Sequence, residues 1–163
     1  MLENAMTACP EDAWAARAKR GTELNAEDSS YQSFWYISFH TLFFLDLYLS
    51  DSVEGFVPPK PFTLDELDPT GILPDRVYTK LELLNYLEHC REKCRIKLEN
   101  LTEENANQLF SGFGFTHYTM LELQLSNMRH VQHHAAQLNL LLRQKTDFAP
   151  NWVGKTKHKL NQT

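Results

Sequence analysis

The sequence is poor in basic residues relative to acidic ones. Lys and Arg total 16 against 21 Asp and Glu, so the formal net charge is −5 at pH 7. Positive charge gathers only in the short tail from Lys155 to Lys159. A protein that binds nucleic acid needs a basic patch to meet the phosphates. The composition therefore argues against a nucleic-acid partner.

Cysteine is scarce, and no apolar run is long enough for a membrane span. Three cysteines are an odd number for a disulfide framework, and no charged and then apolar leader opens the sequence, so we expect a cytoplasmic protein. The longest apolar stretch, Phe34 to Leu49, contains His40 and Asp46. A bilayer crossing needs about 20 apolar residues. The stretch therefore predicts a buried helix, not a membrane segment.

Strand-like alternation, internal repeats and low-complexity segments are also missing. At 163 residues and 42% hydrophobic content, the chain suits one domain with a sizeable core. Helical patterns predict an all-α fold, a four-helix bundle with a long crossover connection. We expect a single domain over 1–163 with its core at about 30–146 and a C-terminal extension at 147–163. The expected helices cover 11–20 (ended by Gly21), about 30–50, 77–101 and from 116 or 119 to 145, with a short turn at 102–105.

The crossover is expected at 51–76, because proline and glycine recur there too often for a helix. These residues are Gly55, Pro58, Pro59, Pro61, Pro69, Gly71 and Pro74. Loops of this length are uncommon in compact domains and are often functional, so the segment could cover a site. The preceding helix is apolar on nearly every face and must be covered all round, which suggests a homodimer.

Two histidines in the last predicted helix could share a metal ion. His130 and His134 are four residues apart, so both project from one face, on the stripe that also holds Leu123 and Leu141. His133 points elsewhere and is expected at the surface. An isolated pair of this kind is as often a coincidence as a site. Buried imidazoles, however, need hydrogen-bond partners or a metal, and the position on the core stripe favours the metal.

A third ligand could come from another helix. His40 is flanked at helical spacing by apolar residues, so it is expected to be buried, as a ligand or as a hydrogen-bonded core histidine. His89 and His117 are expected at the surface. Cys90 and Cys94 are also four apart, but they share the leucine-rich side of their helix and are expected to pack in the core.

The surrounding residues limit the chemistry. In zinc proteases a glutamate follows the first histidine of the pair, whereas Val131 stands here, which excludes that route to peptidase chemistry. Three imidazoles leave coordination positions open, as in catalytic sites. Asp46 and Glu122 are candidate proton acceptors, although helical spacing turns Asp46 about 120° away from His40. Zinc, nickel, copper and iron all accept such ligands.

The chain resembles the DinB/YfiT superfamily over about residues 30–145. The resemblance rests on the segment His40-Thr41-Leu42-Phe43-Phe44-Leu45, on the late motif His130-x-x-His133-His134-x-x-Gln137-Leu138, and on a length near one bundle. It implies that His40, His130 and His134 bind a divalent ion such as nickel or zinc. It also implies a four-helix bundle, often paired as a homodimer. Many relatives have a basic residue and a glycine where this chain has Ala135 and Ala136, which leaves the subfamily open.

These observations suggest a metal-dependent enzyme acting on small molecules. The resemblance favours a thiol-dependent S-transferase or isomerase that uses a low-molecular-weight thiol, and a hydrolase would use the same site. The alternative is a non-catalytic metal-binding or metal-sensing bundle that works through a protein partner. A bundle with core histidines and no metal is the remaining possibility. The crossover and Trp152, expected to dock on an apolar surface, could shape a pocket.

Overall fold

All regular elements of the described residues are helices, which confirms the predicted all-α class. The computed structural model describes residues 1–16, 33–50, 52–110, 112 and 118–155. This part of the chain contains no regular strand, and an isolated bridge pairs Leu109 with Thr119. The elements are α1 (Leu2–Ala8), α2 (Glu11–Trp14), α3 (Phe34–Tyr48), the 3-10 turn η2 (Asp65–Leu67), α4 (Lys80–Glu99), α5 (Glu103–Ala106) and α6 (Met120–Thr146).

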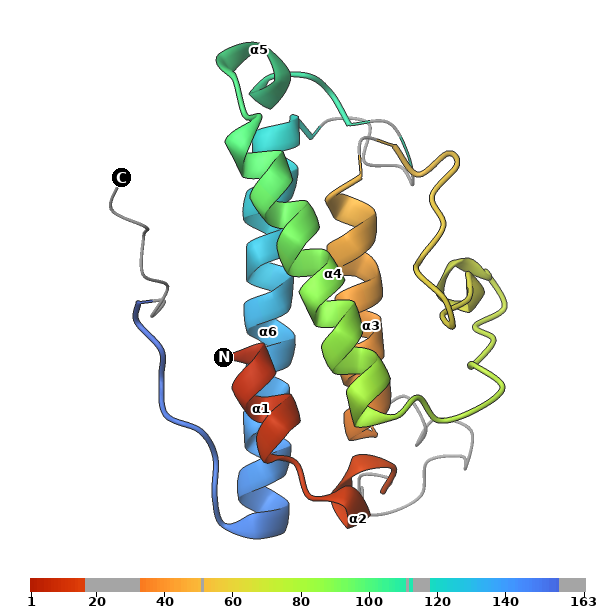
Figure 1. Cartoon of the computed structure of the whole chain (residues 1–163), viewed down its shortest axis with the longest axis vertical. Helices are drawn as coiled ribbons and strands as arrows, with labels where there is room; N and C mark the ends of the chain where they lie inside the picture. Colours follow the sequence, from red (N-terminus) through yellow and green to blue (C-terminus); the bar gives the residue numbers. More distant parts are fainter. Residues whose placement is uncertain (17–32, 51, 111, 113–117, 156–163) are drawn as a thin grey trace.

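Three long helices, α3, α4 and α6, make up most of the fold, and the short α1 lies against α6 and α4 (Figure 1). The helix α3 makes its most extensive contacts with α6. Leu2, Ala5 and Met6 of α1 join the hydrophobic core, which therefore begins well before the expected start near residue 30. None of the described helices is both long enough and apolar enough to cross a bilayer.

The helix α3 is apolar on nearly every face because it has neighbours on nearly every face. Phe39, Leu42, Phe43 and Leu47 are fully buried between α4 and α6. Aromatic residues of the crossover cover a further side, where the ring of Phe62 stacks on Phe39 at 5.8 Å and Phe56 meets Phe43 edge-on at 5.4 Å. The chain itself thus covers much of α3, and these contacts involve no second subunit.

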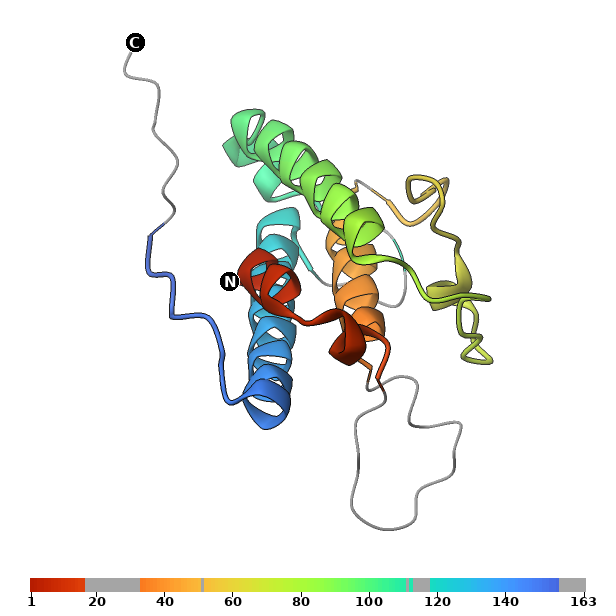
Figure 2. The ribbon, with the colours of Figure 1, turned by 60° about the horizontal axis from the view of Figure 1, so that its bottom comes forward.

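The crossover follows α3 as an irregular segment between α3 and α4, which Figure 2 shows beside the orange helix. Its anchor is Phe62, whose ring also stacks on Tyr86 of α4 at 4.4 Å. A few residues later the chain forms η2, and Leu67 packs against the main core. The predicted absence of a regular helix over 51–76 therefore agrees with the described residues, η2 apart.

Capping boxes define where α4 and α6 begin. Thr119 and Glu122 form the box of α6, at one of the two starts predicted for this helix, and Thr79 and Glu82 form a second one that starts α4 at Lys80. The inward face of α4 is Leu83, Tyr86 and Cys90. Leu98, in the last turn of α4, and Leu101, just after the helix, are 57% and 38% exposed. The C-terminal end of α4 lies beyond the end of α3 (Figure 1).

The predicted N-terminal helix over 11–20 was wrong in extent. It starts at Glu11 after Pro10, as expected, but ends at Trp14, and residues 17–20 and Gly21 lie outside the described residues. Trp14 is buried and its Nε1 donates to the carbonyl of Tyr78 at 2.8 Å, which favours a compact turn over a longer helix.

The expectation for Trp152 was also wrong. Its side chain is 71% exposed and packs on no apolar surface of the described chain. It follows Pro150 in a segment without regular structure, beyond the end of α6. No helical packing fixes the direction of the chain there, so the apolar character of the residue alone did not place it.

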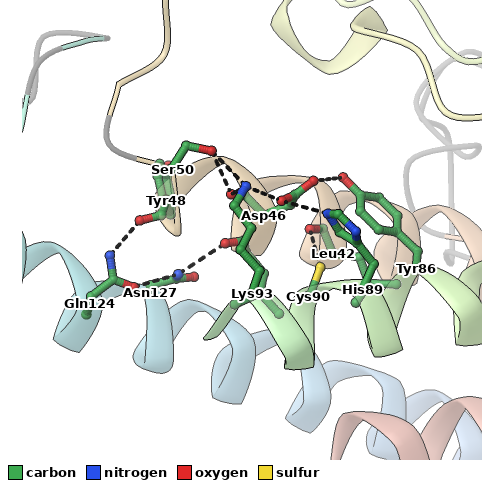
Figure 3. Close-up of polar contacts among 11 residues, drawn as sticks. Leu42, Asp46, Tyr48, Ser50, Tyr86, His89, Cys90, Lys93, Gln124 and Asn127 are labelled. Carbon is green, nitrogen blue, oxygen red and sulfur yellow. Dashed lines mark hydrogen bonds and ion pairs between the residues drawn. The ribbon is translucent and has the colours of Figure 1, made fainter. Parts of the chain in front are cut away.

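A buried carboxylate joins α3 to α4 (Figure 3). Asp46 is fully buried and accepts hydrogen bonds from Tyr86 Oη at 3.0 Å and Lys93 Nζ at 2.5 Å. His89 Nε2 lies 3.4 Å from the same carboxylate. His89 is exposed, as predicted. Lys93 is half-buried, because the flexible stem of a lysine lets its ammonium group reach Asp46 while part of the side chain meets water.

Replacing Asp46 with alanine should lower the free energy of unfolding by about 2–4 kcal/mol, because the buried Tyr86 hydroxyl loses its acceptor and Lys93 loses its counter-ion. Urea unfolding followed by circular dichroism measures the change. Glu92→Ala is the matched control, since Glu92 forms an exposed pair with Arg95 and should cost no more than about 0.5 kcal/mol. Equal losses in the two variants would contradict the role of Asp46.

Candidate metal centre

Contact between α3 and α6 brings all three predicted histidines together. His40 projects from α3, and His130 and His134 project from α6 one turn apart. One ligand atom from each ring lies within 4.8 Å of the others, so the cluster could hold a metal ion. The ring centroids of His40 and His134 are 5.0 Å apart, and those of His130 and His134 are 4.5 Å apart.

A carboxylate sets the orientation of His40. Its Nδ1 lies 2.8 Å from Oε2 of Glu66, whose side chain is only 4% exposed. An ionised carboxylate can only accept, so Nδ1 carries the proton that is donated. The opposite nitrogen, Nε2, faces Nε2 of His130 at 3.5 Å. His40 therefore presents Nε2 to the cluster.

His134 is oriented within its own helix. Its Nδ1 lies 2.7 Å from the amide oxygen of Gln137, three residues later on α6. That oxygen is an acceptor, so Nδ1 donates and Nε2 keeps its lone pair. Gln137 belongs to the late-helix motif of the sequence, and the contact gives that position a physical role. Metal-bound histidines commonly donate the second ring nitrogen in this way.

The third ring, His130, differs from the other two at its second nitrogen. Its Nδ1 is buried and makes no hydrogen bond to any described residue. Burial lowers the pKa of His130 to about 4, and the nearby His134 and His40 rings contribute less to this shift. Burial also lowers the pKa of His134. Both rings are therefore neutral near pH 7, which is the form that binds a metal.

The spacing of the nitrogens fits a small divalent ion. Two nitrogens bound to one tetrahedral zinc at ordinary bond lengths lie about 3.3–3.4 Å apart. The Nε2 atoms of His40 and His130 are 3.5 Å apart, and the third nitrogen lies within 4.8 Å. Three neutral nitrogen donors suit zinc or nickel better than magnesium or calcium, which prefer oxygen.

Aromatic side chains of α3 flank the histidines at four-residue spacing. Phe44 lies 4.8 Å from His40 and 6.0 Å from His130 between ring centroids, and Tyr48 lies 6.4 Å from His130. Tyr36 continues this row beyond His40. The expectation that His40 is buried was only partly right, because 30% of its side chain meets solvent. The centre thus has an apolar wall and a side open to solvent.

The other candidate ligands lie elsewhere. His133 is exposed, as predicted, and His117 lies outside the described residues. All three cysteines are free thiols, Cys90 being fully buried and Cys94 partly so. Burial raises the pKa of both thiols, which disfavours the thiolate that a metal would need. The predicted packing of Cys90 in the core is therefore confirmed.

Neither predicted proton acceptor is placed to serve the cluster. Asp46 is occupied by Tyr86 and Lys93 on the α4 side of α3, as its helical angle indicated. Glu122 caps the first turn of α6 by accepting from Thr119, two turns before His130. The carboxylate near the histidines is Glu66, which sequence reasoning missed. It is one of several acidic residues in an irregular segment, and no periodicity could single it out.

The lowered pKa of His130 predicts a pH dependence for the metal-free protein. Its folded pKa of about 4 lies below the ordinary value of 6.5, so the unfolded chain takes up this proton first as the pH falls. Stability should be full above about pH 6.5 and should decline as the pH drops toward 4. Urea unfolding at pH 7 and pH 5, with a chelator present, tests this. His130→Gln should reduce the difference between the two pH values, and an undiminished difference would contradict the assignment.

The histidine cluster is identified by its geometry alone. No protein-family model, no curated protein and no solved structure matches the chain.

Proposed function

We propose that this chain is a DinB-like four-helix bundle that binds one divalent ion, zinc or nickel, through His40, His130 and His134. The proposal includes a reaction on a small molecule, either thiol-dependent S-transfer or isomerisation with a low-molecular-weight thiol, or hydrolysis. In such a bundle, α1 would occupy the fourth position beside α3, α4 and α6. The resemblance of the His40 segment and the late-helix motif supports the superfamily.

One observation carries the metal assignment: two of the three rings have their second nitrogen bonded to an acceptor. His40 Nδ1 donates a hydrogen bond to Glu66, and His134 Nδ1 donates one to the Gln137 oxygen. Both rings are thereby left with an Nε2 lone pair for the cluster. Converging lone pairs repel one another, and a bound cation turns that repulsion into attraction. A structural role in the core would not require this arrangement.

The chemistry would take place on the open side of the centre. A divalent ion held by three neutral imidazoles supplies a Lewis acid that lowers the pKa of a bound thiol or water. The three histidines would hold the ion, and Phe44 and Tyr48 would exclude water from one side. The partly exposed edge of His40 marks where a small molecule could approach. No described lysine or arginine forms a hydrogen bond or an ion pair with the three rings.

Metal binding tests the shared premise. His130→Ala and His134→Ala should each weaken zinc or nickel affinity by tenfold or more, because each removes a ligand. His133→Ala is the matched control on the same helix and should keep nearly the affinity of the unaltered chain, since His133 is exposed. Competition with a chromogenic chelator gives the affinities. Equal losses in all three variants would contradict the site, as would failure of the unaltered chain to bind either ion.

Activity should depend on the ion. A panel of low-molecular-weight thiols with electrophilic substrates, and of small esters and amides, should reveal turnover that a chelator abolishes and added zinc or nickel restores. Thiol consumption and product release are the measurements, with His134→Ala as the inactive reference. Turnover that survives complete metal removal would contradict a metal-dependent reaction.

The non-catalytic alternative has one observation in its favour. Leu121, Leu125 and Met128 form a row on α6 and are 45%, 52% and 54% exposed. Their spacing of three and four residues puts them on one face, and an apolar row of this kind suits a protein partner or a second copy of the chain. Metal binding without turnover on any substrate class would favour this metal-binding or sensing role.

A further inference from the structure

Glu66 stands apart from the other acidic residues of the crossover because its carboxylate is buried. The side chain is 4% exposed, and Oε2 lies 2.8 Å from Nδ1 of His40. The other oxygen, Oε1, is also buried and has no hydrogen-bond partner among the described residues. A carboxylate with half of its accepting capacity unused in the interior is costly unless a positive charge lies nearby.

We infer that Glu66 is a positioning residue of the metal centre, one that holds His40 with Nε2 toward the ion and supplies negative charge against it. This inference rests on the proposed metal binding. It adds a residue from the crossover to a site otherwise built by two helices. Glu66 acts through the His40 ring and is not itself a ligand, because its bonded oxygen lies at the nitrogen opposite the cluster.

The charge balance around the centre supports this role. The only ion-pair partner of Glu66 in the described chain is His40, and the second oxygen of its carboxylate is buried without a partner there. A divalent ion at Nε2 would polarise the imidazole and make its Nδ1–H a stronger donor to the carboxylate. The buried anion and the bound cation would therefore stabilise each other through one ring.

Contacts on both sides of Glu66 in the crossover fix the position of this carboxylate. Phe62, four residues before Glu66, is fixed between Phe39 and Tyr86, and Leu67 packs against the core directly after it. The turn η2 places Glu66 between these two anchors. Its backbone is held by the bond from Leu67 N to the carbonyl of Leu64 at 2.9 Å. The carboxylate therefore reaches His40 from a segment attached at both ends.

Two substitutions separate orientation from charge. Glu66→Gln keeps an oxygen that can accept from His40 Nδ1 but removes the negative charge, so zinc affinity should fall about tenfold. Glu66→Ala removes both, and the loss should approach 100-fold. Asp65→Asn is the matched control, because Asp65 belongs to the same turn and its carboxylate accepts a hydrogen bond from the exposed Thr63 hydroxyl. It removes one negative charge without touching His40 and should keep the affinity within about twofold of the unaltered chain.

A readout without metal separates a positioning role from a purely structural one. Nitrogen-15 NMR of the chelator-treated protein at pH 7.5 should show the His40 ring with its proton on Nδ1, and Glu66→Ala should shift that proton toward Nε2. Thermal unfolding of the metal-free variants should show no loss of stability, since an incompletely compensated buried carboxylate is removed.

The outcomes are distinguishable. If the unaltered chain binds neither zinc nor nickel, the proposed function fails and this role fails with it. If the unaltered chain binds zinc or nickel, and the metal affinities of Glu66→Ala and Glu66→Gln match that of Asp65→Asn, the metal site stands. Only the proposed role of Glu66 is then ruled out. An unchanged His40 tautomer in Glu66→Ala would also overturn the inference, as would a loss of metal-free stability large enough to account for the weaker binding.

Discussion

The packing of α3 against α6 is the contact on which the candidate site depends. It is the most extensive contact between elements of the fold, and it places His40 of one helix opposite His130 and His134 of the other. The same contact buries much of the aromatic surface of α3 and so lowers the dielectric around the rings. Burial then disfavours the charged imidazolium and keeps His130 ready to act as a ligand. Core packing and site chemistry thus have one physical origin.

The two faces of α3 carry different buried polar groups. His40 faces α6 and the crossover, whereas Asp46, six residues later, faces α4 and is satisfied by Tyr86 and Lys93. Asp46 has its donors within the protein and holds two helices together. The histidine cluster has nitrogens whose lone pairs meet no donor among the described residues other than one another. That contrast between a satisfied and an incompletely satisfied polar group separates a structural contact from a candidate site.

Helical periodicity was sufficient for the parts of the site that lie on one helix. The spacing of His130, His133 and His134 predicted which rings turn inward, and residue 119 is one of the two positions predicted for the start of their helix. The position of His40 required a second helix, and the all-round apolar pattern of α3 could not say which of its faces meets α6. The residues that escaped prediction depend on tertiary placement. Glu66 lies in an irregular segment, Lys93 reaches inward from a polar stripe, and α1 is too short for a periodic signal.

The distance in sequence between the three histidines has a consequence for the whole chain. His40 and His130 are 90 residues apart, and His130 and His134 lie one turn apart on a single helix. An ion bound by all three would be a reversible cross-link that closes a loop containing the crossover and α4. Closing a loop of that length restricts the unfolded chain much as a disulfide does. All three cysteines of this protein are free thiols. A bound ion would then affect the entropy of the unfolded chain as well as the chemistry at the open side of the cluster. The protein would resist unfolding most when the ion is bound.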